Sequence, residues 1–425
     1  MPDYRTTLWG ASPDGEFSLL IDAPQALERI KSYHFAPGTE YSYSNVNFHV
    51  LGRILENVSG MSLAQLLVER LFIPAGMSTA ALCPNTVGLP LPVVGYEGTP
   101  KTGYFKATNR IEWAGDAGIA VTLDDMIAYE KYLIQDPDGL YAVASQQQKY
   151  RDGTDAEYGY GLSRGKIAEK DGIGHGGALR GFKHFRIQMV EDRISVVAMH
   201  NFEVNPGVPV EHVVKGMLKF KDPDAKVYTA AEGFKGNFLD PETQLYVAVV
   251  DGPKPGKIGI SYGPGTGEEM IDLTSETEGK NEDTKLKLDG DVLHMEREHD
   301  NRTLRLERIQ PPTDNEIAQG PALEYVGTYY CEESDSTFNV TNIGGAWYGS
   351  FDGYLGKGPI WMMWQLGGNV FVLGNPRGLD STPPGDWTVV FQPAKDGKSA
   401  GATVGCWLAR KVEYKRVEKS NLGMR

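Results

Sequence analysis

Two short tracts hold the residues whose types could carry out acid–base chemistry. Residues 41–45 read Tyr-Ser-Tyr-Ser-Asn, and residues 175–177 read His-Gly-Gly. The phenol of Tyr43 could accept a proton if nearby cations lowered its pKa from about 10. The two glycines would let a substrate approach the backbone beside His175 closely. Taken singly, a tyrosine in an aromatic, polar turn is normally a packing residue, and a histidine flanked by glycines is usually solvated.

Helical spacing of apolar residues predicts the elements that position the first tract. After Asn45, apolar residues recur at this spacing as far as Gly60, which is a typical helix stop. Ser62 begins a capping-box pattern, so we expect a second helix from there that Pro74 ends. Thr122 gives a similar start signal for a third helix. The first tract therefore leads directly into a helix.

Around the second tract the pattern changes to strands. Residues 184–201 alternate like a β-hairpin with its turn at residues 191–193, and a helix over residues 210–218 follows. Near the start of the chain, Asp22 can cap a short helix with Pro24 in its first turn. The first half of the chain thus mixes helices and strands.

The composition of the chain changes near Lys219. From there, short alternating strands are separated by turns of Gly, Pro, Asn and Asp, which is typical of all-β structure. Two similar runs begin at Gly236 and Gly327, and the Pro-containing linker 310–312 separates them. We interpret them as two related antiparallel barrels, with chance similarity of two β-rich stretches as the alternative. The predicted domains are residues 1–220, 226–312 and 320–420.

Several motifs in fixed order give the chain a family resemblance. Residues 37–45 look like the Tyr-x-Asn tract of the class C β-lactamase and D-peptidase superfamily, and the motifs at 71–77, 115–119 and 175–177 follow in that family's order. The tail and three further segments resemble the bacterial D-aminopeptidases of this penicillin-recognising serine hydrolase superfamily. These segments are residues 107–111, 174–181 and 404–410. The resemblance covers essentially the whole chain.

The resemblance implies an α+β fold. It predicts a β-lactamase/transpeptidase-like catalytic domain, N-terminally incomplete, followed by two antiparallel eight-stranded, lipocalin-like β-barrels. It also implies that Tyr43 is the proton shuttle and that Asn45 holds the scissile amide. His175 would tune the charge beside the tyrosine. The backbone N–H of Ala178, next to Gly177, would supply one donor of the oxyanion hole.

The nucleophile that this family uses, a Ser-x-x-Lys pair before the catalytic tyrosine, is not found in the first 42 residues. Relatives carry a segment like residues 2–4 some way after their nucleophile. We therefore expect a domain-scale piece of about a hundred residues to be missing and this chain to be inactive alone. The one Ser-x-x-Lys match, Ser163 to Lys166, falls in a predicted hairpin turn and after Tyr43, so we interpret it as coincidence.

A long turn-rich loop in the last barrel carries Asp380. In D-aminopeptidases a loop of this barrel reaches the catalytic cleft. A carboxylate there could pair with a free α-ammonium group and repel substrates that carry a carboxylate at the same place. A surface aspartate in a Pro/Gly loop is an equally good interpretation.

Composition excludes several classes of protein. The net charge of -14 and the pI near 5.1 argue against a nucleic-acid-binding surface, which needs clustered Lys and Arg. The three cysteines cannot all pair within the chain, and neither they nor the histidines have zinc-ligand spacing. The first residues lack a secretory signal, and no window is long and apolar enough for a membrane helix. We expect a cytoplasmic protein without metal or cofactor.

These observations predict an aminopeptidase that releases N-terminal D-residues from small peptides or amides through an acyl-enzyme. Within the same chemistry, the alternative is an esterase or a D-alanyl carboxypeptidase/β-lactamase-like relative. From a different class, the chain could be a non-catalytic binding remnant whose barrels hold ligands or subunits. Absence of Ser-x-x-Lys favours the remnant, and the presence of Tyr43, Asn45 and His175 opposes it. A homodimer is plausible for such a multi-barrel protein.

Overall fold

The structure, a computed structural model, describes residues 28, 33–85, 89, 93–108, 114–221, 226–263, 269–314, 323–353, 356–374, 387–407 and 409–418. The described residues group into two compact units. One unit contains the described residues up to Ser44 together with those from residue 226 onward, and the other contains residues 45–221. The predicted helix at Asp22 lies outside the described residues.

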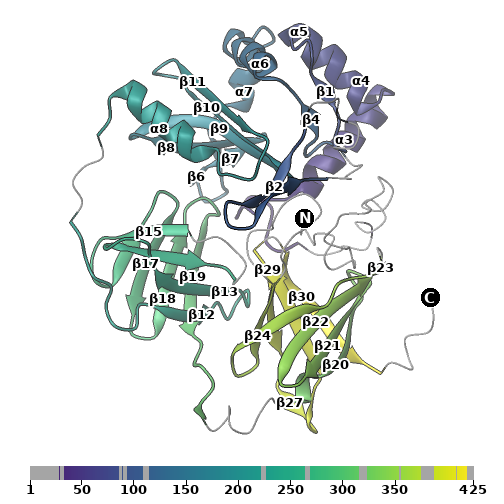
Figure 1. Cartoon of the computed structure of the whole chain (residues 1–425), viewed down its shortest axis with the longest axis vertical. Helices are drawn as coiled ribbons and strands as arrows, with labels where there is room; N and C mark the ends of the chain where they lie inside the picture. The colour runs from purple at the N-terminus through teal and green to yellow at the C-terminus, as the bar shows by residue number, and fades with distance from the viewer. Residues whose placement is uncertain are drawn as a thin grey trace. The chain divides into compact units, whose positions relative to one another are not determined.

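The unit of residues 45–221 is built on a five-stranded antiparallel sheet of order β11-β10-β9-β8-β7. Its strands are β7 (Tyr158–Gly159), β8 (Leu162–Ile167), β9 (Lys170–Leu179), β10 (Phe182–Met189) and β11 (Ile194–His200). The hairpin predicted over residues 184–201 is confirmed as β10 and β11. The His-Gly-Gly tract lies on β9, the central strand of the sheet (Figure 1).

Local sequence signals account for most of the helices in this unit. The helices are α3 (Asn45–Ser59), α4 (Leu63–Leu67), the π-helical turn η1 (Val68–Phe72), α5 (Ile73–Ala75), α6 (Leu123–Gln135), α7 (Leu140–Ala144) and α8 (Gly207–Leu218). The capping boxes predicted at Ser62 and Thr122 are both present. Gly60, with φ of 70°, follows α3 as predicted. No helix in the described ranges is both long and apolar enough to cross a membrane.

The prediction that Pro74 ends the second helix is wrong. The backbone instead passes through η1 and continues helically to Gly76, whose φ of 75° terminates it. Pro74 lies in the first turn of α5, where a missing N–H costs little because the first backbone donors of a helix have no partner within it. The π-helical turn η1 interrupts the α-helical hydrogen bonding, so α5 begins after it as a new helix with Pro74 in its first turn.

One face of the five-stranded sheet packs against a helix, and the other carries polar side chains. Phe185, Ile187 and Met189 point to one face, where they form an apolar cluster with Val210 and Val214 of α8. This helix lies along the sheet (Figure 1). The intervening residues His184, Arg186 and Gln188 point to the opposite face because side chains alternate along a strand. That second face carries the polar groups of the candidate site.

Short strand pairs complete this unit. They are β1 (Ala81–Leu82) with β4 (Ile119–Ala120), β2 (Tyr96–Thr99) with β3 (Gly103–Lys106), and β5 (Gln148–Lys149) with β6 (Asp155–Ala156).

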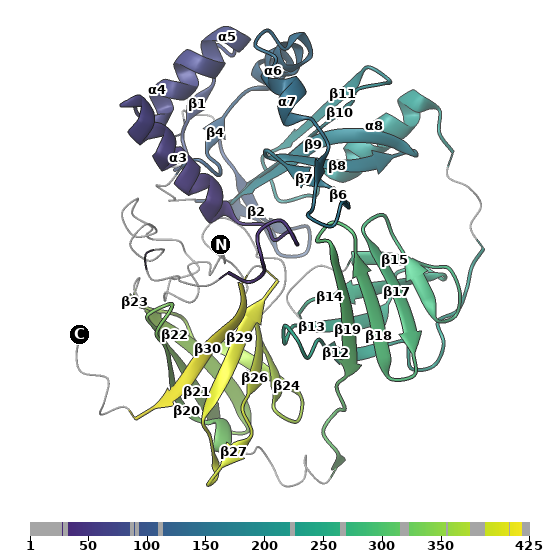
Figure 2. The same cartoon turned by 180° about the vertical axis from the view of Figure 1, so that it is seen from behind.

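The other unit contains two closed antiparallel barrels of eight strands each, which confirms the predicted fold (Figure 2). The first consists of β12 (Gly236–Leu239), β13 (Tyr246–Asp251), β14 (Lys257–Ser261), β15 (Glu269–Leu273), β16 (Glu278–Lys280), β17 (Thr284–Asp289), β18 (Val292–Arg297) and β19 (Arg302–Arg308). Its interior is filled by alternating apolar residues such as Leu286, Leu293 and Leu306.

The second barrel closes through pairing of β21 with β22. It consists of β20 (Gly327–Cys331), β21 (Ser336–Ile343), β22 (Ala346–Gly353), β24 (Trp361–Gly367), β25 (Val370–Leu373), β26 (Trp387–Phe391), β29 (Gly401–Cys406) and β30 (Ala409–Val417). Additional short elements are β23 (Gly356–Lys357), β27 (Ala394–Lys395), β28 (Lys398–Ser399) and the 3₁₀ turn η3 (Leu323–Tyr325). Its core is aromatic, with Trp387, Phe338 and Phe371 among the fully buried side chains.

The two barrels pack against each other within their unit. Tyr246 and Ala248 of the first form a small apolar cluster with Val372 of the second. Trp407, from the turn between β29 and β30, packs into the core of the first barrel, where its ring meets that of Tyr262 edge-on with 4.7 Å between the ring centroids. A side chain of the second barrel thus completes the packing of the first.

Candidate active site

His175 lies half-buried on β9, and its ring is held from both sides. The Tyr158 hydroxyl is 3.0 Å from Nε2, and the two rings meet edge-on at 5.6 Å. Nδ1 bonds the carbonyl of Gly176. A carbonyl only accepts, so the proton resides on Nδ1, and Nε2 accepts the hydrogen bond that Tyr158 donates. Sequence inspection did not single out Tyr158, because only the pairing of β7, β8 and β9 brings it to His175.

The surroundings of His175 favour its neutral form. Burial lowers the pKa of the imidazole below its ordinary value, and the positive charge of Arg186 lowers it further, while the hydrogen bond to the Gly176 carbonyl acts in the opposite direction. Arg186 pairs directly with His175 across β10 and β9. At neutral pH this histidine therefore supplies a hydrogen bond rather than a positive charge.

Arg186 is itself held by a buried network around Glu130 of α6. The Glu130 carboxylate accepts bonds from Nε and Nη2 of Arg186, the second at 2.9 Å, and both side chains are almost fully buried. Gln188 Nε2 and Ser195 Oγ donate to the same carboxylate at 2.7 and 2.6 Å. The network fixes the guanidinium beside His175 and links α6 to the sheet.

Gly177 leaves space for the imidazole of His184. A Cβ atom at this position would lie 2.1 Å from Nε2 of His184, its partner across the strand pair. Burial, followed by the neighbouring His175 and Arg186, lowers the pKa of His184 to about 4. The imidazole of His184 is thus a neutral packing group over the glycine. Ala178, the predicted oxyanion residue, follows on β9 and pairs with Lys183.

Asn45 begins α3, and the family motif around Gly115 fixes that helix. His49 Nδ1 of α3 donates to the Ala114 carbonyl at 3.1 Å. Gly115 has φ of 118°, and a Cβ there would lie 2.6 Å from the carbonyl oxygen of Phe48. Only glycine allows this close approach, so the motif at 115–119 acts by positioning the helix that Asn45 begins.

The predicted site residues fall into separate groups. His175, Gly177 and Ala178 are brought together on β9. Tyr43 lies just before α3 in the unit that contains the barrels, and its side chain is 37% exposed. Asn45 belongs to the unit of residues 45–221. Asp380 lies outside the described residues.

The Ser163–Lys166 match lies on strand β8 rather than in a hairpin turn, which precedes it at Tyr160 and Gly161. Residues three apart on a strand lie about 10 Å apart and point to opposite faces. Lys166 forms an exposed ion pair with Asp171 instead. The strand rules out the side-by-side arrangement that a Ser-x-x-Lys nucleophile requires.

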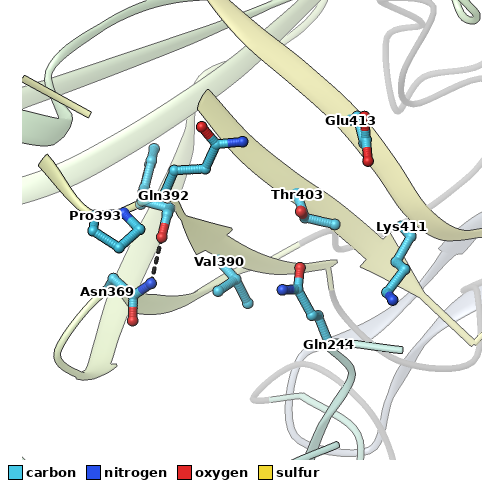
Figure 3. Close-up of a pocket in the computed structure, with 9 residues that line it drawn as sticks. Gln244, Asn369, Val390, Gln392, Pro393, Thr403, Lys411 and Glu413 are labelled. Atoms are coloured by element: carbon cyan, nitrogen blue, oxygen red, sulfur yellow. Dashed lines mark hydrogen bonds between the residues drawn. The ribbon is translucent and has the colours of Figure 1, made fainter. Parts of the chain in front are cut away.

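A cavity of about 330 Å³ lies in the other unit, between the barrels (Figure 3). Its lining is largely polar, with amides, a lysine and a glutamate. The lining residues are Gln244, Asn369, Val390, Phe391, Gln392, Pro393, Thr403, Lys411 and Glu413. None of the predicted site residues in the described ranges lines it, so we do not assign the catalytic chemistry to this cavity.

Comparison with known proteins connects both halves of the chain to one family. Residues 3–213 match the family model described as "Beta-lactamase", and residues 227–415 match "D-aminopeptidase, domain B". The D-aminopeptidases of Brucella canis and Brucella anthropi are 40% and 39% identical to this chain over 415 and 417 residues. Each alignment covers 97% of this chain and 78% of the relative.

Among solved structures, a penicillin-binding protein from Bacillus halodurans is similar with a TM-score of 0.43 and 21% identity, over 51% of this chain and 68% of that one. The sequence relationship to the D-aminopeptidases extends through the β-lactamase-related part and the barrels alike. The chain therefore belongs to the D-aminopeptidase family of β-lactamase-related serine hydrolases.

Proposed function

We propose that this protein releases N-terminal D-amino acids from small peptides and amides through an acyl-enzyme. The observation that best supports the proposal is the neutral His175, held between Tyr158 and the Gly176 carbonyl on the strand that also carries Ala178. With both ring nitrogens engaged, this neutral imidazole holds the β9 backbone beside Ala178 in place and adds no positive charge near neutral pH.

In the proposed reaction, Tyr43, Ala178 and Asn45 each have one role. A serine hydroxyl attacks the amide carbonyl while Tyr43, as phenolate, takes the hydroxyl proton. The N–H of Ala178 donates to the oxyanion, and Asn45 orients the scissile amide. Tyr43 then returns the proton to the leaving amine, and water releases the D-amino acid from the serine ester. We assign the nucleophilic serine to no residue of the printed sequence.

Hydrolysis of D-alanine p-nitroanilide, by the protein as its source cell makes it, tests this proposal. Tyr43→Phe should lower kcat about a hundredfold or more, because general acid–base groups contribute roughly 10²–10⁴. Tyr104→Phe, which changes a tyrosine that is 52% exposed on β3, is the matched control. Full activity of Tyr43→Phe would show that this tyrosine is not the proton shuttle.

We also propose that Asp380 recognises the free α-ammonium group of the substrate. Its place in a sequence stretch rich in turn residues and its charge support this role. Asp380→Asn should weaken discrimination between D-alanine p-nitroanilide and its N-acetyl derivative at least tenfold. Unchanged discrimination would remove Asp380 from the proposal. Hydrolysis of p-nitrophenyl acetate without amide hydrolysis would instead indicate an esterase.

Finally, we propose a cytoplasmic homodimer. Cell fractionation and light scattering of the purified protein test location and assembly separately, and a monomeric mass or a periplasmic fraction would contradict the respective part.

A further inference from the structure

The segment that leads to Tyr43 is held by the barrels. Residues 33–44 belong to the barrel unit, although they precede α3 directly in the sequence. Within this segment the backbone from Glu40 to Ser44 forms neither helix nor strand. A segment without regular hydrogen bonding of its own needs outside contacts to keep one conformation.

The strongest of these contacts is an ion-pair cluster around Glu40. Its Oε2 lies 2.8 Å from Nη1 of Arg410 on β30 and 3.2 Å from Nε of Arg302 on β19. One carboxylate thus bridges the two barrels. The side chains of Arg410 and Arg302 are only 5% and 4% exposed, compared with 28% for Glu40.

The two guanidinium groups depend on this carboxylate. Burial is the main cause that lowers the pKa of Arg302 to about 10, and the charge of Arg410 lowers it further. The carboxylate of Glu40 raises this pKa, and those of Asp300 and Asp240 raise it to a smaller extent. Two buried cations side by side repel each other, so a bridging anion stabilises both. Loss of the Glu40 charge would therefore weaken the attachment of the segment to each barrel at once.

Neighbouring contacts fix the next residues on the way to Tyr43. Asn301, in the turn between β18 and β19, donates from Nδ2 to the Thr39 carbonyl at 2.9 Å. The Tyr41 N–H donates to the Asp300 carbonyl at 3.0 Å. Beyond these, the Ser42 hydroxyl reaches the Trp407 carbonyl at 3.4 Å.

We propose that Glu40 is a positioning residue, which ties the Tyr43 segment to both barrels and so sets the placement of the catalytic phenol. Its catalytic consequence rests on the proposed function of Tyr43, whereas the anchoring itself does not. The barrels then serve the reaction by holding a segment of the active site, in addition to any contact that they make with substrate.

Glu40→Gln tests the proposal, because it removes the charge and keeps the shape. Two measurements are made on the protein as its source cell makes it: hydrogen exchange of the backbone amides of residues 41–44, and kcat and KM for D-alanine p-nitroanilide. Glu278→Gln is the matched control, since Glu278 forms an exposed ion pair of 3.0 Å with Lys287 on the first barrel. Asn301→Asp, which removes the donor to Thr39, loosens the segment independently.

We expect Glu40→Gln to raise exchange at residues 41–44 about tenfold or more, with exchange in β17 and β18 unchanged. The value of kcat should fall about tenfold with KM within twofold, because Tyr43 acts in the transition state. Glu278→Gln should change neither quantity. Unchanged exchange in Glu40→Gln, or raised exchange with unaltered kcat, would overturn the proposal, and raised exchange in Asn301→Asp would show that the assay detects a loosened segment. An inactive wild-type protein would refute the proposed function, and exchange would still decide the anchoring.

Discussion

Replacing Glu130 by glutamine would leave the guanidinium of Arg186 in the interior without its counter-ion. Both side chains are nearly inaccessible, at 7% and 5% exposure, so solvent cannot compensate for the lost charge. Removing one partner of a buried ion pair costs about 3–5 kcal/mol. The glutamine oxygen can still accept from Gln188 and Ser195, but its NH2 group would face the Nε–H of Arg186, so the change removes the carboxylate charge together with one acceptor.

A double-mutant cycle with Arg186→Met measures this coupling. The free energy of opening is obtained from native-state hydrogen exchange of β10 and β11 amides, which reports on this unit separately from the barrels. Each single variant should lose about 3–5 kcal/mol, and the double variant should lose at least about 2 kcal/mol less than their sum. Single losses below about 1 kcal/mol, or strictly additive losses, would refute the view that this pair anchors α6 to the site face.

Three further predictions concern individual residues. Tyr158→Phe removes the hydrogen-bond donor to Nε2 of His175, which stabilises the neutral imidazole, so the pKa of His175 should rise. NMR titration measures this pKa, and an unchanged or lower value would contradict the assignment of the proton to Nδ1. Gly177→Ala should destabilise the β9–β10 pair by about 1–3 kcal/mol in the same exchange assay, since its Cβ would overlap the His184 ring; full stability would contradict that packing. Burial, with the charge of Arg410 as the second cause, lowers the pKa of His34 from 6.5 to about 3. At pH values between these two, His34 therefore binds a proton in the unfolded chain but not in the folded protein. The free energy of unfolding should therefore decrease on acidification by up to about 1.4 kcal/mol per pH unit. In urea titrations, His34→Gln should show a shallower decrease with falling pH than the wild type. An equally steep decrease in the variant would refute the lowered pKa of His34.

Local signals in the sequence predicted the elements that depend on local interactions. The capping boxes at Ser62 and Thr122 formed because each needs only a side chain and a backbone N–H three residues away. The repeat beginning at Gly236 and Gly327 predicted both barrels for a similar reason, since hairpin pairing is set by turns and alternation. Pro74 misled the helix assignment because a π turn depends on backbone hydrogen bonding that residue types do not reveal.

The interactions around the site could not be predicted in this way. Tyr158 meets His175 only through the pairing of three strands, and Glu130 meets Arg186 across 56 residues. Glu40 is one of 56 acidic residues, and nothing in its neighbourhood marks it as the partner of arginines more than 250 residues away. Family motifs identified Tyr43, Asn45 and His175 as candidates, but the groups that hold a candidate in place come from the tertiary fold.

The most direct test of the central claim is the ratio of kcat/KM for D-alanine p-nitroanilide to that for the L-enantiomer, measured on the protein as its source cell makes it. A D-aminopeptidase should prefer the D-substrate by at least about a hundredfold, which corresponds to roughly 2.7 kcal/mol of transition-state binding. Equal rates for both enantiomers, or no hydrolysis of either, would contradict the proposed function.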